Sequence, residues 1–195
     1  MITRKSASSR ADEVLKEIEA ASKKQFLPII GPHKGKFLAA EVRKAKPRHV
    51  LEVGTLIGYS AILMGKELDE NSEIETIEMH RDESELTGKN IARANIPAKV
   101  KVITGDALEV IPTLKGSFDF AFIDAEKSEY FQYLKLAENK LRKGAVVFAD
   151  NAGIFANQML DYLNYVRNSV NYKSKYVQVG GDGVEISVKW VSRPR

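Results

Sequence analysis

Four polar residues in the second half of the chain have side chains that could hold a hard cation and remove a proton. Asp124 follows the apolar run F-A-F-I, and Asp150 and Asn151 follow the run V-V-F-A. Two carboxylates and an amide oxygen are ligands that Mg²⁺ accepts, with Mn²⁺ or Ca²⁺ as competitors. Lys127 lies three residues after Asp124, where a neighbouring cation would favour the neutral amine and make it a general base. The structural alternative is that Asp124 caps a helix, Asp150 and Asn151 form a turn, and Lys127 is a solvated side chain.

A turn with two glycines comes earlier, in the sequence V-L-E-V-G-T-L-I-G-Y-S over residues 50–60. Dinucleotide-binding loops need the pattern G-x-G-x-x-G, but only Gly54 and Gly58 are present, so a close approach of pyrophosphate is not provided for. Glu52 lies just before the turn and would repel phosphate. Its charge suits a ligand with positive charge and no phosphate, such as S-adenosylmethionine. A glycine turn with a purely structural role is the alternative.

Two more acids end the next two apolar runs. Glu78 follows E-T-I, where it could accept hydrogen bonds from both hydroxyls of a ribose. Asp106 follows T-G, where it could accept from an adenine amino group. Each acid alone could equally be a helix N-cap or a solvated strand end. Three acids at three consecutive strand ends, in the order of the ligand's parts, favour a binding site.

The elements that must position these residues are short β-rich runs that alternate with helical patterns. The runs cover 49–53, 73–79, 100–104, 118–123 and 145–149, and the helical patterns lie near 60–68, 82–94, 107–114, 128–142 and 157–168. Such alternation predicts a doubly wound parallel sheet with helices on both faces. Two last runs, 172–179 and 184–191, are separated only by G-G-D-G and predict an antiparallel β-hairpin. The predicted fold class is therefore α/β, with a seven-stranded, mostly parallel sheet.

The first 46 residues differ from the rest of the chain. Residues 11–25 and 34–45 have helical spacing, and the part before Lys34 matches no catalytic motif. We expect one domain over 1–195, with 1–46 as an N-terminal helical cover over the cofactor and a homodimer surface, and 47–195 as the core.

Composition narrows the classes of function. Of 195 residues, 44% are hydrophobic and none is cysteine, which excludes disulfides, thiolate metal sites and cysteine nucleophiles. The net charge of +4 is explained by a solvated surface about as well as by nucleic-acid binding. No apolar stretch reaches the roughly 18 residues of a membrane helix, and the polar first residues lack a signal peptide's apolar segment, so we expect a cytoplasmic protein with no membrane partner.

Taken together, the motifs L-E-V-G-T-L-I-G-Y-S, I-E-M, G-D-A, F-I-D-A-E-K-S-E-Y, F-A-D-N and G-D-G resemble those of the cation-dependent O-methyltransferases. This family of class I S-adenosylmethionine-dependent enzymes, with a Rossmann-like fold, includes catechol and caffeoyl-coenzyme A O-methyltransferases. The resemblance runs from about Lys34 to the C-terminus. It implies that Lys127 and Asp124 are catalytic and that Asp124, Asp150 and Asn151 bind the metal. It implies a cofactor site made of Glu52, Gly54, Tyr59, Ser60, Glu78, Met79, Asp106, Ala107 and Asp124.

Two departures from the family pattern bear on the acceptor. Only a few residues separate Asn151 from the next helical pattern, so the wall of the acceptor pocket should be low. The segment 173–181 lacks the acid that holds the second hydroxyl in animal catechol enzymes, which disfavours a simple catechol. The leading hypothesis is methyl transfer to a small molecule with vicinal oxygens. The alternatives are the same chemistry on a hydroxylated tRNA nucleoside, favoured by the basic stretch 34–48, and a non-catalytic protein that binds S-adenosylmethionine.

Overall fold

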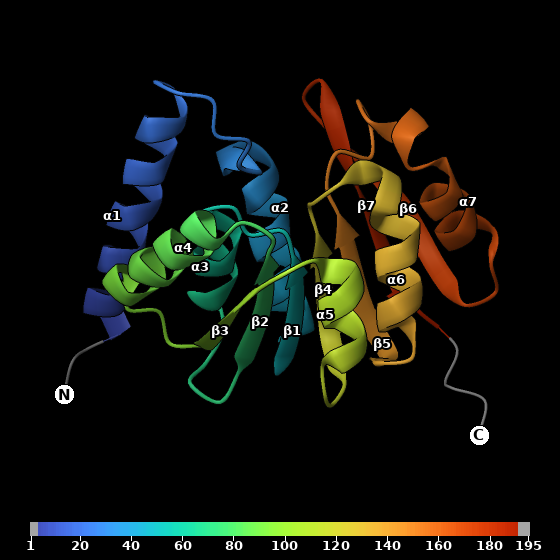
Figure 1. The fold of residues 1–195 in the computed structure, drawn as a ribbon, viewed down its shortest axis with the longest axis horizontal. Helices are drawn as coiled ribbons and strands as arrows, with labels where there is room; N and C mark the ends of the chain where they lie inside the picture. Colours follow the sequence, from blue (N-terminus) through green and yellow to red (C-terminus); the bar gives the residue numbers. More distant parts are fainter. Residues whose placement is uncertain (1–3, 191–195) are drawn as a thin grey trace.

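The computed structural model describes residues 4–190 and contains one seven-stranded sheet in the order β3-β2-β1-β4-β5-β7-β6 (Figure 1). The strands are β1 (His49–Val53), β2 (Glu73–Glu78), β3 (Lys99–Thr104), β4 (Phe118–Ile123), β5 (Leu141–Ala149), β6 (Tyr172–Val179) and β7 (Asp182–Lys189). The first five are parallel, and β7 runs antiparallel to both β5 and β6. The predicted fold class, including the C-terminal hairpin, is confirmed.

Helices cover both faces of the sheet. They are α1 (Arg4–Ser22), α2 (Gly31–Ala45), α3 (Tyr59–Gly65), α4 (Arg81–Ala94), α5 (Ala107–Thr113), α6 (Tyr130–Glu138) and α7 (Leu160–Asn168), with 3-10 turns η1 (Lys127–Glu129) and η2 (Ala156–Gln158). One core cluster joins α5, α6 and α7 to the sheet, and a second joins α1, α2, α3 and α4 to its other face. None of the helices in residues 4–190 is both long and apolar enough to cross a membrane.

The second halves of β4 and β5, 120–123 and 145–149, read as unbroken apolar runs because both of their faces are buried. In β4, Phe120 and Phe122 belong to one core cluster, and Ala121 and Ile123 belong to the other. Successive side chains of a strand point to opposite faces, so a strand between two helical layers needs apolar residues at every position. The strand order reverses between β1 and β4, and ligands bind at the carboxyl ends of strands beside such a reversal.

Helix α1 packs on the outside of α3 and α4 rather than on the sheet (Figure 1). The hydroxyl of Tyr59, the first residue of α3, donates to the Glu19 carboxylate on α1 at 2.6 Å. Ion pairs between Lys66 and Asp12 and between Arg93 and Glu17 hold the same interface. The apolar residues Ala11, Val14, Leu15 and Ile18 bury this side of α1 in the core, and the polar contacts add to their packing.

Candidate active site

A cavity of about 710 Å³ opens at the carboxyl edge of the sheet. Its lining includes ten of the residues that the sequence predicts for the site: Gly54, Tyr59, Ser60, Glu78, Met79, Ala107, Asp124, Lys127, Asp150 and Asn151. Glu52 and Asp106 are not part of the lining. The loops that follow five parallel strands therefore meet at one hollow.

Gly54 lies where the loops after β1 and β4 come closest together. Its φ is +84°, and a Cβ atom there would lie 2.3 Å from the carbonyl oxygen of Asp124. The amide of Gly54 donates to Ile77 on one side, and the amide of Asp124 donates to Val53 on the other. Only glycine combines this conformation with this close approach.

Glu78 holds the rest of the same loop. Its carboxylate accepts hydrogen bonds from the amides of Leu56 at 2.7 Å, Thr55 at 3.3 Å and His80 at 3.1 Å. Leu56 has a φ of +54°, a left-handed conformation that costs about 1–2 kcal/mol for an L-residue. The carboxylate stabilises that conformation and keeps acceptor capacity for a ligand in the cavity.

Glu52 lies behind the cavity wall and is fully buried. Burial raises the pKa of Glu52 to about 7, against the lowering effect of the neighbouring hydroxyls of Ser60, Thr76 and Thr55. Ser60 lines the cavity in front of it. Direct contact between Glu52 and a ligand stays a prediction.

Asp106 has a structural role that the sequence left open. Its side chain accepts a hydrogen bond from the amide of Leu108 at 2.8 Å, which makes it the N-cap of α5. Its neighbour Ala107 lines the cavity. Direct binding of adenine by Asp106 stays a prediction.

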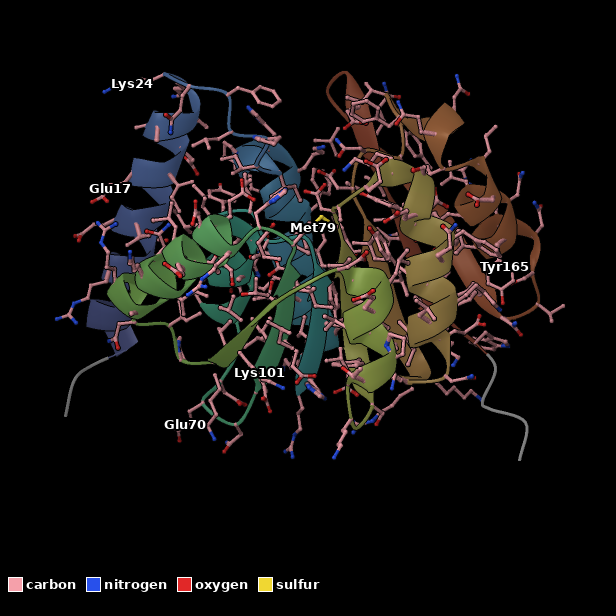
Figure 2. The ribbon with its side chains drawn as sticks, viewed as in Figure 1. Glu17, Lys24, Glu70, Met79, Lys101 and Tyr165 are labelled. Atoms are coloured by element: carbon pink, nitrogen blue, oxygen red, sulfur yellow. The ribbon has the colours of Figure 1, made fainter. Side chains whose placement is uncertain are left out.

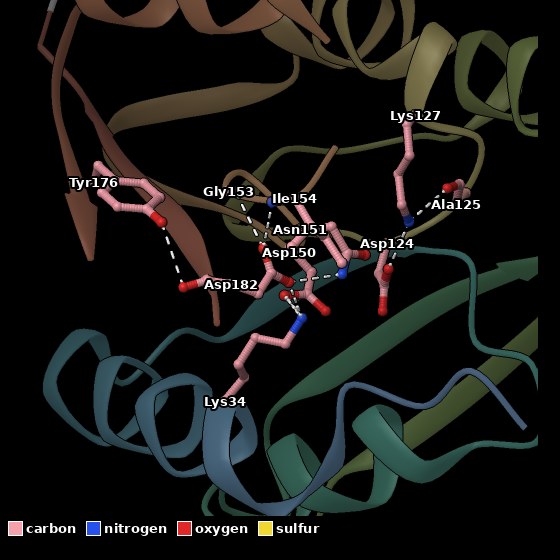
Figure 3. A network of polar contacts seen from close by, with 10 residues as sticks. All are labelled: Lys34, Asp124, Ala125, Lys127, Asp150, Asn151, Gly153, Ile154, Tyr176 and Asp182. Atoms are coloured by element: carbon pink, nitrogen blue, oxygen red, sulfur yellow. Dashed lines mark hydrogen bonds and ion pairs between the residues drawn. The ribbon is translucent and has the colours of Figure 1, made fainter. Parts of the chain in front are cut away.

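The predicted metal ligands and the predicted base come together in the same cavity (Figure 3). Lys127 Nζ donates to Asp124 Oδ1 at 3.0 Å and to the carbonyl of Ala125 at 2.9 Å. Burial and the charge of Asp124 raise the pKa of Asp150 to about 7, although Lys34 opposes the shift. Two carboxylates next to an amide oxygen are a donor set that fits a hard divalent cation.

An ion-pair frame supports these ligands from outside. Lys34 Nζ, on α2, lies 2.6 Å from Asp150 Oδ1 and 2.8 Å from Asp182 Oδ2. Asp182 Oδ2 also accepts from the side-chain amide of Asn151 at 3.0 Å, which turns the amide oxygen of Asn151 away from the frame. We call Lys34 and Asp182 the Lys34–Asp182 frame.

The family model described as O-methyltransferase matches residues 5–171. The chain belongs to the O-methyltransferase family. This confirms the resemblance drawn from the motifs.

Individual relatives agree with the assignment. The chain is 36% identical to the catechol O-methyltransferase of Niastella koreensis over 63% of its own length and 57% of the relative's. It is 36% identical to catechol O-methyltransferase B of Danio rerio over 82% of its own length and 64% of the relative's. It thus spans about three-fifths of these two relatives. A structure of the O-methyltransferase TomG from Streptomyces achromogenes, in complex with SAM, superimposes with a TM-score of 0.84 at 26% identity, over 92% of this chain and 90% of that one.

The sequence motifs did not predict the roles of Lys34 and Asp182. Asp182 Oδ1 accepts from the amides of Gly153 at 3.1 Å and Ile154 at 2.9 Å. Burial opposes ionisation of Asp182, but donors from Lys34 and the 151–154 loop outweigh it and hold the pKa at about 2. The sequence contained two indications of these roles: the G-D-G motif, which includes Asp182, and Lys34, at which the resemblance to the family begins. Neither indicated that the two side chains form an ion pair.

Large apolar side chains lie open at the mouth of the cavity. Phe26, in the segment between α1 and α2, lines the cavity and is 91% exposed. Phe155 also lines it, and Ile154 next to it is 60% exposed. The segment 23–30, rather than α1 itself, therefore borders the cavity, and a covering role for the N-terminal helices stays a prediction.

Proposed function

We propose that this protein transfers a methyl group from S-adenosylmethionine to a hydroxyl of a small acceptor with vicinal oxygens, and that the reaction needs a divalent cation, with Mg²⁺ as the first candidate. One observation carries the proposal: a single cavity joins the Gly54–Glu78 loops to the Asp124, Asp150, Asn151 and Lys127 side chains. The S-adenosylmethionine complex of the Streptomyces relative supports the identity of the donor.

In this proposal the two groups of lining residues have separate tasks. The backbone around Gly54, fixed by Glu78, binds the donor and aims its methyl group toward Asp124. A cation held by Asp124, Asp150 and Asn151 would supply positive charge that acidifies an acceptor hydroxyl.

Lys127 removes the proton. In the structure its ammonium group pairs with Asp124, and positive charge beside Asp124 would weaken that pair and favour the neutral amine. The acceptor oxygen then attacks the methyl carbon in line with the breaking carbon–sulfur bond, and S-adenosylhomocysteine leaves. The contribution of the protein is alignment of donor and acceptor plus one proton transfer.

The test is methyl transfer to a panel of vicinal-oxygen acceptors, with and without chelator. Chelation should abolish turnover, and added Mg²⁺ should restore it. Lys127→Met should lower kcat by about 10²–10⁴-fold, the usual contribution of a general base, with unchanged affinity for S-adenosylhomocysteine. Lys115→Met, which changes an exposed lysine outside the cavity lining, is the matched control.

Three outcomes would contradict the proposal. Full turnover by Lys127→Met would refute the assignment of the base. Binding of S-adenosylhomocysteine without binding of a cation or any acceptor would favour a non-catalytic role. Methylation of tRNA with no small-molecule turnover would move the same chemistry to a nucleoside acceptor. Homodimer formation and cytoplasmic location stay predictions, which light scattering and fractionation would test.

A further inference from the structure

A second hollow lies at the opposite, amino edge of the sheet. It has a volume of about 550 Å³ and lies between the end of α2, the segment before β1 and the start of β5. Arg48 in its lining is six residues before Gly54, so at about 3.3 Å per residue the two hollows are roughly 20 Å apart. We call this hollow, together with the neighbouring face of β6 and Trp190, the basic groove.

Positive charge is concentrated in the basic groove. Its lining contains Lys44, Lys46, Arg48, Arg142 and Lys143, with Glu41 and Asp119 as its acids. Lys173 is opposite the lining residue Val188 in the sheet register, and Lys175 Nζ lies 3.7 Å from Glu41. Seven cations against two acids leave five excess positive charges, whereas the whole chain has a net charge of only +4.

Much of this charge is not neutralised within the protein. Asp119 pairs with Arg142 at 2.8 Å, and Glu41 lies 3.7 Å from Lys44 and from Lys175. Four cations have no carboxylate within 4.0 Å in the part of the chain that the structure describes; these are Lys46, Arg48, Lys143 and Lys173. A concave surface that keeps one sign of charge attracts a polyanion.

An exposed tryptophan extends this charged surface. Trp190 is 51% exposed, and its ring has Lys173 Nζ at 3.6 Å and Lys143 Nζ at 5.9 Å from its centroid. Lys173 Nζ lies over the ring, and about half of the Trp190 surface stays exposed. Exposed aromatic rings in a positively charged groove are the surfaces on which proteins stack the bases of a single strand. A flat anionic membrane would need neither the concavity nor a stacking surface.

We propose that the basic groove binds single-stranded nucleic acid, with phosphates on Lys46, Arg48 and Lys143 and a base stacked on Trp190. The proposal concerns binding at the amino edge, so it does not depend on the methyl acceptor. It also gives a direct readout, because Trp190 is the one tryptophan of the chain.

The experiment measures the anisotropy of a labelled 12-nucleotide RNA and the intrinsic fluorescence of the full-length chain over a range of KCl concentrations. We expect binding that quenches Trp190, with a log–log salt slope of about −2 to −4, since each phosphate contact on a single strand contributes about −0.7. Arg48→Glu combined with Lys143→Glu should weaken binding at least tenfold. Trp190→Ala should weaken RNA binding about tenfold but leave the affinity for inorganic polyphosphate unchanged.

The matched control is Lys23→Glu combined with Lys24→Glu, which makes the same charge change beyond the end of α1. Lys24 lies at the end of the molecule opposite Glu70 and Lys101, which mark the amino edge of β2 and β3 (Figure 2). Thermal unfolding of each variant separates lost binding from lost folding.

An equal loss of affinity in the control pair would overturn the proposal, because net charge alone would then explain binding. RNA binding that does not quench Trp190, or that does not depend on salt, would also overturn the proposal. Binding of anionic vesicles by a protein that does not bind RNA would overturn it as well. Equal loss of polyphosphate affinity in Trp190→Ala would overturn the stacked base.

Discussion

Glu52 should make the folded chain less stable as the pH rises from about 4.5 to about 7, and Glu52→Gln should remove that dependence. Burial raises the pKa of this carboxyl from 4.5 to about 7 in the folded chain, whereas the unfolded chain keeps the ordinary value. Between these two pH values the unfolded state loses the proton and the folded state retains it. Stability from this group is therefore complete below pH 4.5 and is lost as the pH rises through about 7.

The magnitude follows from the width of that window. Each pH unit corresponds to 1.36 kcal/mol, so a window from 4.5 to about 7 gives about 3 kcal/mol. For a chain of this size, 1 kcal/mol shifts Tm by roughly 2–4 °C. The contribution of Glu52 to Tm should thus differ by about 6–12 °C between the two ends of the window.

Urea unfolding of the wild type and Glu52→Gln at matched pH values isolates this group, because all other carboxyls titrate in both proteins. Glu73→Gln is the matched control, since Glu73 is exposed at the start of the neighbouring strand β2. Relative to the wild type, Glu52→Gln should gain about 3 kcal/mol between pH 4.5 and pH 8, and Glu73→Gln should gain nothing. A difference that is constant with pH would refute the reasoning, because Glu52 would then ionise alike in both states.

Three further changes test other parts of the site. Gly54→Ala places a methyl group 2.3 Å from a carbonyl oxygen and should cost at least about 2 kcal/mol of stability, together with a tenfold loss of S-adenosylhomocysteine affinity by calorimetry. Gly144→Ala, with a φ of +85° and open space around it, should show the backbone strain alone, and equal losses in both variants would contradict the role of the contact. Lys34→Met removes the cation between two carboxylates and should lower Tm by several degrees, and added Mn²⁺ should raise the Tm of this variant more than that of the wild type. Lys36→Met, which changes an exposed lysine on the same helix, should alter neither the Tm nor its response to Mn²⁺. An equal response of both variants to Mn²⁺ would count against the role of the Lys34–Asp182 frame. Tyr59→Phe removes the 2.6 Å hydrogen bond to α1 and should speed amide exchange in that helix; unchanged exchange would mean that the ion pairs suffice.

The sequence predicted the strands and the polar residues at their ends because both follow short-range rules. A strand between two helical layers is mostly apolar, and parallel strands bring their carboxyl ends to one edge. That is why ten of the expected residues line one cavity. The start of β5 was placed too late, at 145 instead of Leu141. The exposed segment R-K-G resembles a helix end, and pairing of Leu141 with Phe118 overrides that local pattern.

The sequence pattern could not predict how deeply a side chain is buried or which distant residues form pairs. Alternation shows which face of β1 carries Glu52, but not that Glu52 is fully buried and outside the cavity lining. The N-cap role of Asp106 and a ligand-binding role require the same residue type at the same strand end, so only coordinates assign the hydrogen bond to Leu108. Lys34 and Asp182 are separated by 148 positions, and no periodicity connects them.

The frame also gives the antiparallel hairpin a part in the site. Because β7 runs against β5, with Ala149 opposite Glu185, the beginning of β7 reaches the same edge as the end of β5. Asp182 is therefore beside Asn151, where it can orient the amide and hold the 151–154 loop. If β7 ran parallel to β5, its last residue would lie at the carboxyl edge of the sheet. Its first residue would then lie at the amino edge, beside the basic groove. The reversal of one strand thus supplies a supporting carboxylate that the parallel strands, whose end residues already line the cavity, do not provide.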